Sequence, residues 1–171
     1  LFSNKSRRCM KKILIISTGG TFNKVYDPIK GEFVVDKSSQ ALEEIASKWL
    51  CEFEILNIIG KDSLEMTNQD RLELLATISQ SEYHYILIVH GTDTMDVTAA
   101  YLADADLEKS IVLTGAMVPY SIDPVEATAN LSCAYGFIHA LKEEGIFIAM
   151  NGIIGTYDKV KKDRVKGRFT L

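Results

Sequence analysis

The sequence of 171 residues predicts a single α/β domain in which a mostly parallel sheet carries helices on both faces. Five short runs of β-branched and aliphatic residues alternate with four stretches in which apolar residues recur at helical spacing. Most of the apolar runs lack polar alternation, which is typical of parallel strands that helices cover on both sides. A composition of 47% hydrophobic and 25% charged residues is that of a globular protein with a continuous core.

The expected elements follow one another as a β-α repeat. The strands are expected at Ile13–Ile16, Ile55–Ile59, Tyr85–Val89, Ile111–Leu113 and Ile146–Met150. The helices are expected at Gln40–Leu50, Asn68–Ser79, Val97–Ala105 and Glu126–Leu141.

Local signals support the starts of two helices and one hairpin. Thr67 is a suitable N-cap three residues before Asp70, and Asp123 is a suitable N-cap directly before Pro124. The segment from residue 23 to residue 36 carries a proline, a glycine and then a short apolar run. This segment predicts a loop that returns as a small hairpin after the first strand, and such a loop could close over a ligand.

The start of the sequence is expected to lie outside the domain. Residues 1–11 are predicted to be a leader that is disordered or upstream of a natural translation start at Met10, with the domain over residues 12–171. The apolar run after the basic opening is too short for the hydrophobic region of a signal peptide, and it leads into a glycine turn. No transmembrane segment is visible, so we expect no membrane partner.

Composition and spacing exclude several classes of function. Net charge is -4 and basic residues are mostly interleaved with acidic ones, so nucleic acid is not an expected partner. Neither the Walker spacing nor the dinucleotide fingerprint occurs at the first β-α turn, and we expect no cofactor. Cys9, Cys51 and Cys133 have neither disulfide-framework nor metal-ligand spacing, and the three histidines are scattered. We therefore expect no metal and a reducing, cytoplasmic location.

Hydroxyl groups, glycines and one carboxylate follow the ends of the expected strands. In open α/β sheets, ligands bind beyond the carboxyl ends of the strands. The informative ends are Ser17–Thr21, His90–Thr94, Thr114–Met117 and Asn151–Gly152. Glycine lets the backbone approach a ligand, and a threonine hydroxyl becomes a nucleophile once a base removes its proton. The coincidence of these ends predicts a binding or catalytic site.

Each of these residues also has a purely structural interpretation. A Gly-Gly pair after a strand is often only a turn. His90, at a strand end, can simply satisfy backbone groups, and Asp93 can cap the helix that follows it.

Three motifs together resemble the signature blocks of the bacterial-type L-asparaginases. These are TGGTF at Thr18–Phe22, HGTDTM at His90–Met95 and GAMVP at Gly115–Pro119, in the same order and at comparable spacing. The resemblance extends from residue 12 to about residue 169 and implies the flavodoxin-like N-terminal domain of that family. Because family members continue into a smaller C-terminal domain near where this sequence stops, it also implies a stand-alone N-terminal domain.

The resemblance implies a set of catalytic residues. Thr21 matches the nucleophile on the family's mobile loop, whereas Thr92 and Asp93 match a second threonine and the carboxylate of a Thr-Lys-Asp triad. The end of the sequence offers four candidates for the triad lysine: Lys159, Lys161, Lys162 and Lys166. Of these, Lys162 aligns best. Tyr26 is a candidate for the loop tyrosine that hydrogen-bonds the nucleophile.

The same resemblance implies a pocket for a small substrate. Ser63 matches the serine that holds the α-carboxylate of the substrate, and Asp93 also matches the group that holds its α-amino group. Ala116 would present backbone near the amide that is cleaved. Gly20 and Gly91, within the two threonine motifs, are expected to line this pocket.

The implied function is an amidohydrolase that releases ammonia from L-asparagine or a related small amide through a threonine acyl-enzyme. Lys162, in neutral form, would act as base toward Thr92, with Asp93 orienting the pair. A neighbouring subunit normally completes the site in this family, so we expect a homo-oligomer. Two alternatives stay open: a non-catalytic amino-acid-binding module, and an ammonia-producing subunit of a larger amidotransferase with a separate partner chain.

Overall fold

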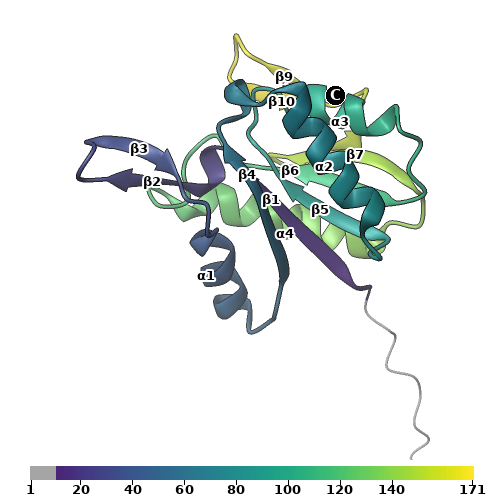
Figure 1. The fold of residues 1–171 in the computed structure, drawn as a ribbon, viewed down its shortest axis with the longest axis horizontal. Helices are drawn as coiled ribbons and strands as arrows, with labels where there is room; N and C mark the ends of the chain where they lie inside the picture. Colours follow the sequence, from purple (N-terminus) through teal and green to yellow (C-terminus); the bar gives the residue numbers. More distant parts are fainter. Residues whose placement is uncertain (1–10) are drawn as a thin grey trace, which may run out of the picture.

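A six-stranded sheet forms the centre of the chain in the computed structural model, which describes residues 11–171 (Figure 1). Five of its strands run parallel in the order β4-β1-β5-β6-β7. They are β1 (Ile13–Gly19), β4 (Glu54–Lys61), β5 (Tyr85–Val89), β6 (Ser110–Thr114) and β7 (Gly145–Met150). The five strands predicted from the sequence are confirmed, and their order is that of a flavodoxin-like fold.

Four α-helices cover the two faces of this sheet. They are α1 (Gln40–Trp49), α2 (Asn68–Gln80), α3 (Met95–Ala103) and α4 (Pro124–Ala140). Helices α1 and α4 pack against one face, and α2 and α3 pack against the other (Figure 1). The predicted helices are confirmed, but α3 begins at Met95 instead of Val97, because the chain turns into the helix directly after Thr94.

Alternate side chains of β1 serve the two cores. Ile13 and Ile15 pack with α1 and α4, while Leu14 and Ile16 pack with α2 and α3. This is the two-residue period of a strand, and each such side chain contributes about 1.5–3 kcal/mol on full burial. Both sets of side chains are buried, so the strand needs apolar residues at every position, as the unbroken run in the sequence predicts.

Side-chain caps fix the starts of two helices as predicted. The Thr67 hydroxyl accepts a hydrogen bond from the Asp70 N–H, and the Asp70 carboxylate accepts one from the Thr67 N–H, which makes a capping box. At α4, the Asp123 carboxylate accepts from the Val125 N–H, and Pro124 occupies the first turn.

Lys11, the last residue of the predicted leader, contacts the end of α4. Its ammonium group donates to the Ile138 carbonyl oxygen at 3.2 Å and to that of Leu141, at the end of α4. A cation at the C-terminus of a helix is favourable because the helix dipole is negative there. The rest of the predicted leader, residues 1–10, lies outside the described residues.

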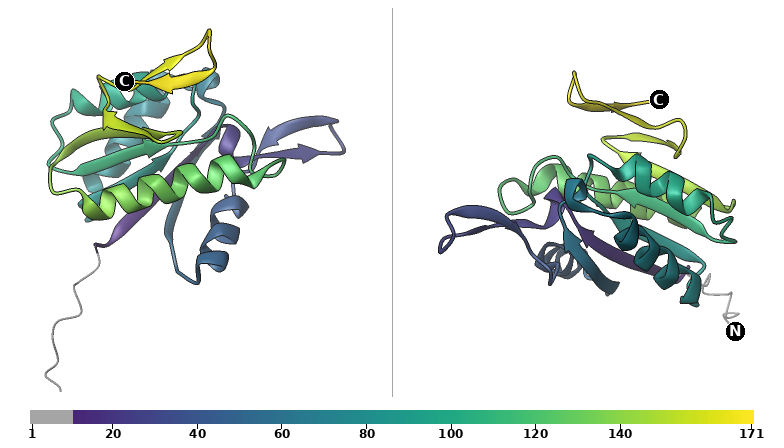
Figure 2. Two further views of the ribbon diagram at one scale, coloured as in Figure 1. Left: turned by 180° about the vertical axis from the view of Figure 1, so that it is seen from behind. Right: turned by 45° about the horizontal axis from the view of Figure 1, so that its top comes forward.

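The predicted hairpin forms directly after the first strand. A short 3₁₀ helix at Thr21–Asn23 leads into β2 (Lys24–Asp27), which pairs antiparallel with β3 (Glu32–Val35). The hairpin projects from the carboxyl edge of the sheet (Figure 2). Its turn is exposed, with Ile29 96% accessible.

Three short strands near the end of the chain were not predicted. They are β8 (Ile153–Thr156), β9 (Lys161–Asp163) and β10 (Arg168–Thr170). β8 pairs antiparallel with β7, so Asn151 and Gly152 form a two-residue hairpin turn with φ of 51° and 79°. Asn-Gly between apolar runs is a strong hairpin signal that would have revealed β8. β9 and β10 form a separate hairpin (Figure 2).

Membrane-spanning helices and metal-binding clusters are both absent from residues 11–171. No helix in this part of the chain has the length and apolar character needed to cross a membrane. Nor does any group of three or more histidine, cysteine, aspartate or glutamate side chains there have an arrangement that could hold a metal ion. Cys51 and Cys133 are free thiols, and Cys9 lies outside the described residues.

The capping box predicts a loss of stability in acid. The ion pair from Lys61 and the backbone bond at Thr67 lower the pKa of Asp70 from 3.8 to about 2. A lowered folded-state pKa adds stability above the unfolded value, and this stability is lost as pH falls from 3.8 toward 2. We expect the free energy of unfolding to fall by about 1–2 kcal/mol in this window, discounted because Lys61 is partly exposed.

Urea unfolding of the wild type and Asp70→Asn at several pH values measures this effect. The variant should be less stable near neutral pH and should lose less stability in acid. The control is Asp106→Asn, which removes an exposed carboxylate that has no hydrogen-bond partner among residues 11–171. An acid dependence that is equal in the wild type and Asp70→Asn would contradict the assignment.

Candidate active site

The segments that follow β1, β4 and β5 pack directly against one another, with their backbones in close contact. Gly20 has φ of 77°, which favours glycine, and a Cβ there would lie 2.5 Å from the Gly91 Cα. A Cβ on Gly91 would in turn lie 2.5 Å from the Cβ of Ser63. Two predicted pocket glycines and the predicted carboxylate-binding serine are therefore in direct contact.

A bulge in β4 carries the chain to Ser63. The register between β1 and β4 shifts between Ser17 and Gly19. Within β4, Ile59 has φ of 67°, a strained conformation for a β-branched residue that costs about 1–3 kcal/mol. The bulge lets the Gly20 N–H donate to the Lys61 carbonyl oxygen at 2.9 Å. Ser63 follows two residues later, only 2% exposed.

Lys162 joins the two predicted triad residues. Its Nζ donates to the Thr92 Oγ1 at 2.8 Å and lies 2.9 Å from the Asp93 Oδ1. The lysine is on β9, whereas Thr92 and Asp93 follow β5. The Lys162 side chain is 18% exposed, Thr92 is 5% exposed and the Asp93 side chain is 34% exposed, so the contact with Thr92 is better shielded from water than the contact with Asp93. Of the four candidate lysines, the structure brings Lys162 to this position.

Asp93 does not cap the helix that follows it. The N-cap of α3 is Thr94, without a side-chain capping bond, and the Thr94 hydroxyl donates to the Ser63 carbonyl oxygen at 2.8 Å. The Asp93 carboxylate instead faces two cations, Lys162 and Arg164. Arg164 also donates to the Asp93 carbonyl oxygen. The contact of Arg164 was not predicted, because its partner Asp93 lies 71 residues away and the sequence around Arg164 does not indicate it.

Thr21 lies at the start of the 3₁₀ helix after Gly20 and is partly exposed. Its hydroxyl makes no hydrogen bond to another group in residues 11–171. Tyr26, the candidate loop partner, is 57% exposed, and its ring packs edge-on against Phe33 with centroids 5.6 Å apart. In the described part of the chain Tyr26 makes no hydrogen bond to Thr21, so this role stays a prediction.

His90 has the position expected of a structural histidine. It is fully buried, and its Nδ1 lies 2.7 Å from the Gly91 carbonyl oxygen. Burial lowers its pKa to about 4, so the ring is neutral near pH 7. A neutral ring with Nδ1 as the donor holds the Gly91 carbonyl, directly before Thr92.

The loop after β6 closes the other side of the site. A Cβ on Gly115 would clash with the His90 carbonyl oxygen, so this loop lies directly against the end of β5. Ala116 is completely buried there. All of the predicted site residues except the hairpin residue Tyr26 lie on β9 or in the loops and short 3₁₀ helices that follow the carboxyl ends of the strands.

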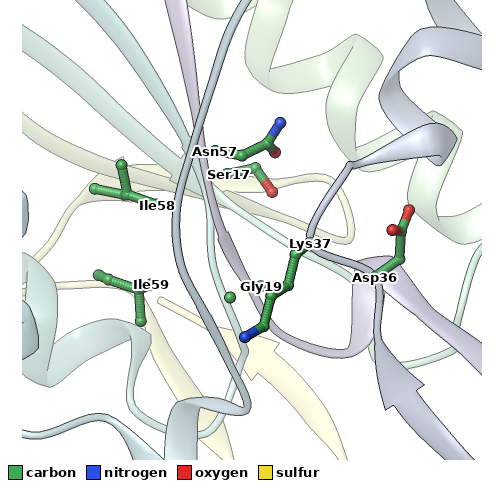
Figure 3. Close-up of a pocket in the computed structure, with 8 residues that line it drawn as sticks. Ser17, Gly19, Asp36, Lys37, Asn57, Ile58 and Ile59 are labelled. Carbon is green, nitrogen blue, oxygen red and sulfur yellow. The ribbon is translucent and has the colours of Figure 1, made fainter.

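A small cavity lies next to this edge but is separate from the triad (Figure 3). It measures about 100 Å³, well below the 300 Å³ or more of an ordinary ligand pocket. Eight residues line it: Ser17, Gly19, Asp36, Lys37, Asn57, Ile58, Ile59 and Gly60. The Ser17 hydroxyl, which lines the cavity, already accepts from Asn23 at 3.0 Å and from Ser39 at 2.7 Å.

Two known proteins are similar in sequence to this chain. A probable periplasmic L-asparaginase from Haemophilus influenzae is 29% identical, over 89% of this chain and 46% of the relative. A glutamyl-tRNA(Gln) amidotransferase subunit from Pyrococcus furiosus is 32% identical, over 75% of this chain and 31% of the relative.

A solved structure shares the fold. The thermostable L-asparaginase from Thermococcus kodakarensis matches with a TM-score of 0.80 and 25% identity, over 92% of this chain and 50% of that chain. The chain thus spans about half the length of the L-asparaginases that it matches. Residues 12–169 match the family described as "Asparaginase, N-terminal", and the chain belongs to this family.

Proposed function

We propose that the chain is an amidohydrolase that releases ammonia from L-asparagine or a related small amide. The observation that carries this proposal is the placement of the Lys162 amine between the Thr92 hydroxyl and the Asp93 carboxylate. A lysine beside a threonine hydroxyl can act as a base only in neutral form, and the neighbouring carboxylate stabilises the ammonium ion that results. A lysine that is fully exposed to water would not need the Thr92 and Asp93 side chains as partners.

In the proposed reaction, Thr21 forms the acyl-enzyme. Its Oγ attacks the amide carbon, the hydroxyl proton passes through the Thr92 and Lys162 pair, and the C–N bond breaks as ammonia leaves with a proton. Water then attacks the ester, and the acid product is released with Thr21 restored. Backbone N–H groups would stabilise the oxyanion in both steps. This scheme requires no cofactor.

The turns around the triad suit an amino-acid substrate. Ser63 and the adjacent backbone of Gly20 and Gly91 would hold the α-carboxylate. Both cations that contact Asp93 lie against its Oδ1, and the second carboxylate oxygen has no partner among residues 11–171. An α-ammonium group could bind there with a charge-assisted hydrogen bond.

Two alternative functions can be tested against this proposal. A non-catalytic binding module would use the same polar turns, but it has no need for a lysine on a threonine hydroxyl. An ammonia-producing subunit that works with a separate partner chain is favoured by the likeness to the amidotransferase subunit from Pyrococcus furiosus. Ammonia release by the purified chain alone separates the first alternative from the proposal, and a requirement for a partner chain supports the second.

We also propose a cytoplasmic homo-oligomer. The free thiols of Cys51 and Cys133 suit a reducing compartment. Exposed apolar side chains follow the β6 loop at Val118, Ile122 and Val125, and a second copy of the chain could cover them. Light scattering during gel filtration measures the mass of the assembly.

Removing the lysine amine should abolish turnover. Lys162→Met keeps the aliphatic stem but removes the base, and we expect ammonia release from L-asparagine to fall by at least about 100-fold. Thr92→Val should cause a loss of similar size, because the two groups act as a unit. The matched control is Lys161→Met, which changes the neighbouring, exposed lysine on β9. Full activity in Lys162→Met, or an equal loss in Lys161→Met, would show that the triad is misassigned.

A bound ligand should protect the segment from Phe22 to Phe33, which includes β2 and the hairpin turn, from proteolysis. Lys30 is exposed in its turn, so trypsin should cleave there in the free protein. If aspartate binds only the closed form, cleavage should slow about tenfold at a concentration of about ten times its Kd. Cleavage at Lys142, which is exposed at the opposite end of the sheet, is the internal control. Equal slowing at both sites, or at neither, would argue against a lid.

A further inference from the structure

Helix α4 presents two polar side chains to the loops at the carboxyl edge of the sheet. Glu126 and Asn130 are four residues apart and therefore lie on the same helix face. Asn130 is 3% exposed, and Glu126 is half-buried. The capping of α4 is already supplied by Asp123, so neither side chain is needed to start the helix.

Asn130 bridges the ends of β6 and β7. Its Nδ2 donates to the Gly115 carbonyl oxygen at 2.9 Å, and its Oδ1 accepts from the Asn151 N–H at 2.9 Å. Both halves of the amide are thus used, which leaves the side chain one orientation. Gly115, the first residue after β6, and Asn151, the first residue after β7, are thus both hydrogen-bonded to Asn130.

Glu126 holds the next part of the β6 loop. Its two carboxylate oxygens accept from the Met117 N–H, each at 3.1 Å, and Oε2 also accepts from the Val118 N–H at 2.9 Å. Oε1 accepts a third donor, the Asn151 Nδ2, at 3.1 Å. Hydrogen bonds to an ionised acceptor are stronger than those between neutral groups, so this is a firm attachment for the loop.

These contacts fix both peptide groups that flank Ala116. In a planar trans peptide, the C=O and N–H groups point in opposite directions. Because Asn130 holds the Gly115 carbonyl, the Ala116 N–H in the same peptide points away from α4. Because Glu126 holds the Met117 N–H, the Ala116 carbonyl also points away from α4. Both backbone groups of Ala116 therefore point to the side opposite the helix, although the residue is fully buried in the free chain.

We propose that Glu126 and Asn130 are positioning residues that hold the backbone of Ala116 toward the amide of the substrate. The inference rests on the proposed amidohydrolase function, because it assigns these residues to the side of the site that faces the leaving amide. The Ala116 carbonyl would accept from the amide NH₂, which orients the bond that breaks. A misplacement of about 1 Å in such a group can cost about 100-fold in rate.

Glu126→Ala tests the proposal through the loop itself and through catalysis. The amide protons of Met117 and Val118 should exchange with solvent at least about tenfold faster in the variant. The kcat for L-asparagine should fall by about 10- to 100-fold. The Kd for L-aspartate should stay within about twofold, because aspartate has no side-chain N–H for the Ala116 carbonyl to accept.

Glu126→Gln is the conservative rescue and Glu143→Ala is the matched control. The glutamine carbonyl oxygen can still accept from the Met117 and Val118 N–H groups, so its kcat should fall by no more than about fivefold. Glu143 is an exposed glutamate beyond the other end of α4, and its removal should leave kcat unchanged. The midpoint of thermal unfolding of each variant shows whether it is folded.

The outcomes separate this inference from the proposed function. Unchanged amide exchange or unchanged kcat in Glu126→Ala overturns the inference and leaves the proposed function standing. A joint loss of kcat, aspartate affinity and Tm also overturns it, because Glu126 would then only hold the fold. If the wild type releases no ammonia from asparagine or other small amides, the proposed function fails, and the inference that rests on it fails as well.

Discussion

The candidate active site depends on the close approach of two backbone turns, at Gly20 after β1 and at Gly91 after β5. A methyl group at Gly20 would lie 2.5 Å from the Gly91 Cα, and one at Gly91 would lie 2.5 Å from the Ser63 Cβ. No side chain fits at either position without moving the backbone. Because a threonine follows each glycine, this approach brings Thr21 and Thr92 to the same edge of the sheet. The strained bulge in β4 serves the same contact, since it brings the backbone before Ser63 against the first turn.

The two cores keep these turns in register. Strands β1, β5, β6 and β7 bury both of their faces, so a slip of one residue in any of them would exchange the side chains of the two cores and separate the strand ends. The polar groups at the edge are then held by partners from other elements. Thr18 donates to the Val89 carbonyl oxygen at 3.0 Å and ties the end of β1 to the end of β5, while Asn130 ties the end of β6 to that of β7. Side chains from β1 and α4 therefore hold the backbone at neighbouring strand ends together.

Many features of the fold could be predicted because their causes are local. The runs at residues 13–16 and 85–89 contain enough aliphatic side chains to indicate buried strands without reference to the rest of the chain. Thr67 and Asp123 cap helices through bonds that span three residues or fewer, so the sequence around them was sufficient. The strands β9 and β10 were missed because three residues carry little periodicity, and their pairing depends on the turn that joins them.

Sequence alone was enough to establish the order of the main strands and helices, the helix caps, the hairpin after β1 and the motifs that contain the threonines and Asp93. How these groups are used depends on the way the chain folds. Lys162 is 70 positions from Thr92, and among the four lysines near the end of the chain only the family resemblance, and no local feature, singled it out. The pairing of β9 places Lys162 at this position, and the Asp93 carboxylate then contacts the Lys162 Nζ instead of capping the helix. Local signals act over about one helical turn, whereas a partly buried charge requires an opposite charge from whichever segment the fold brings beside it.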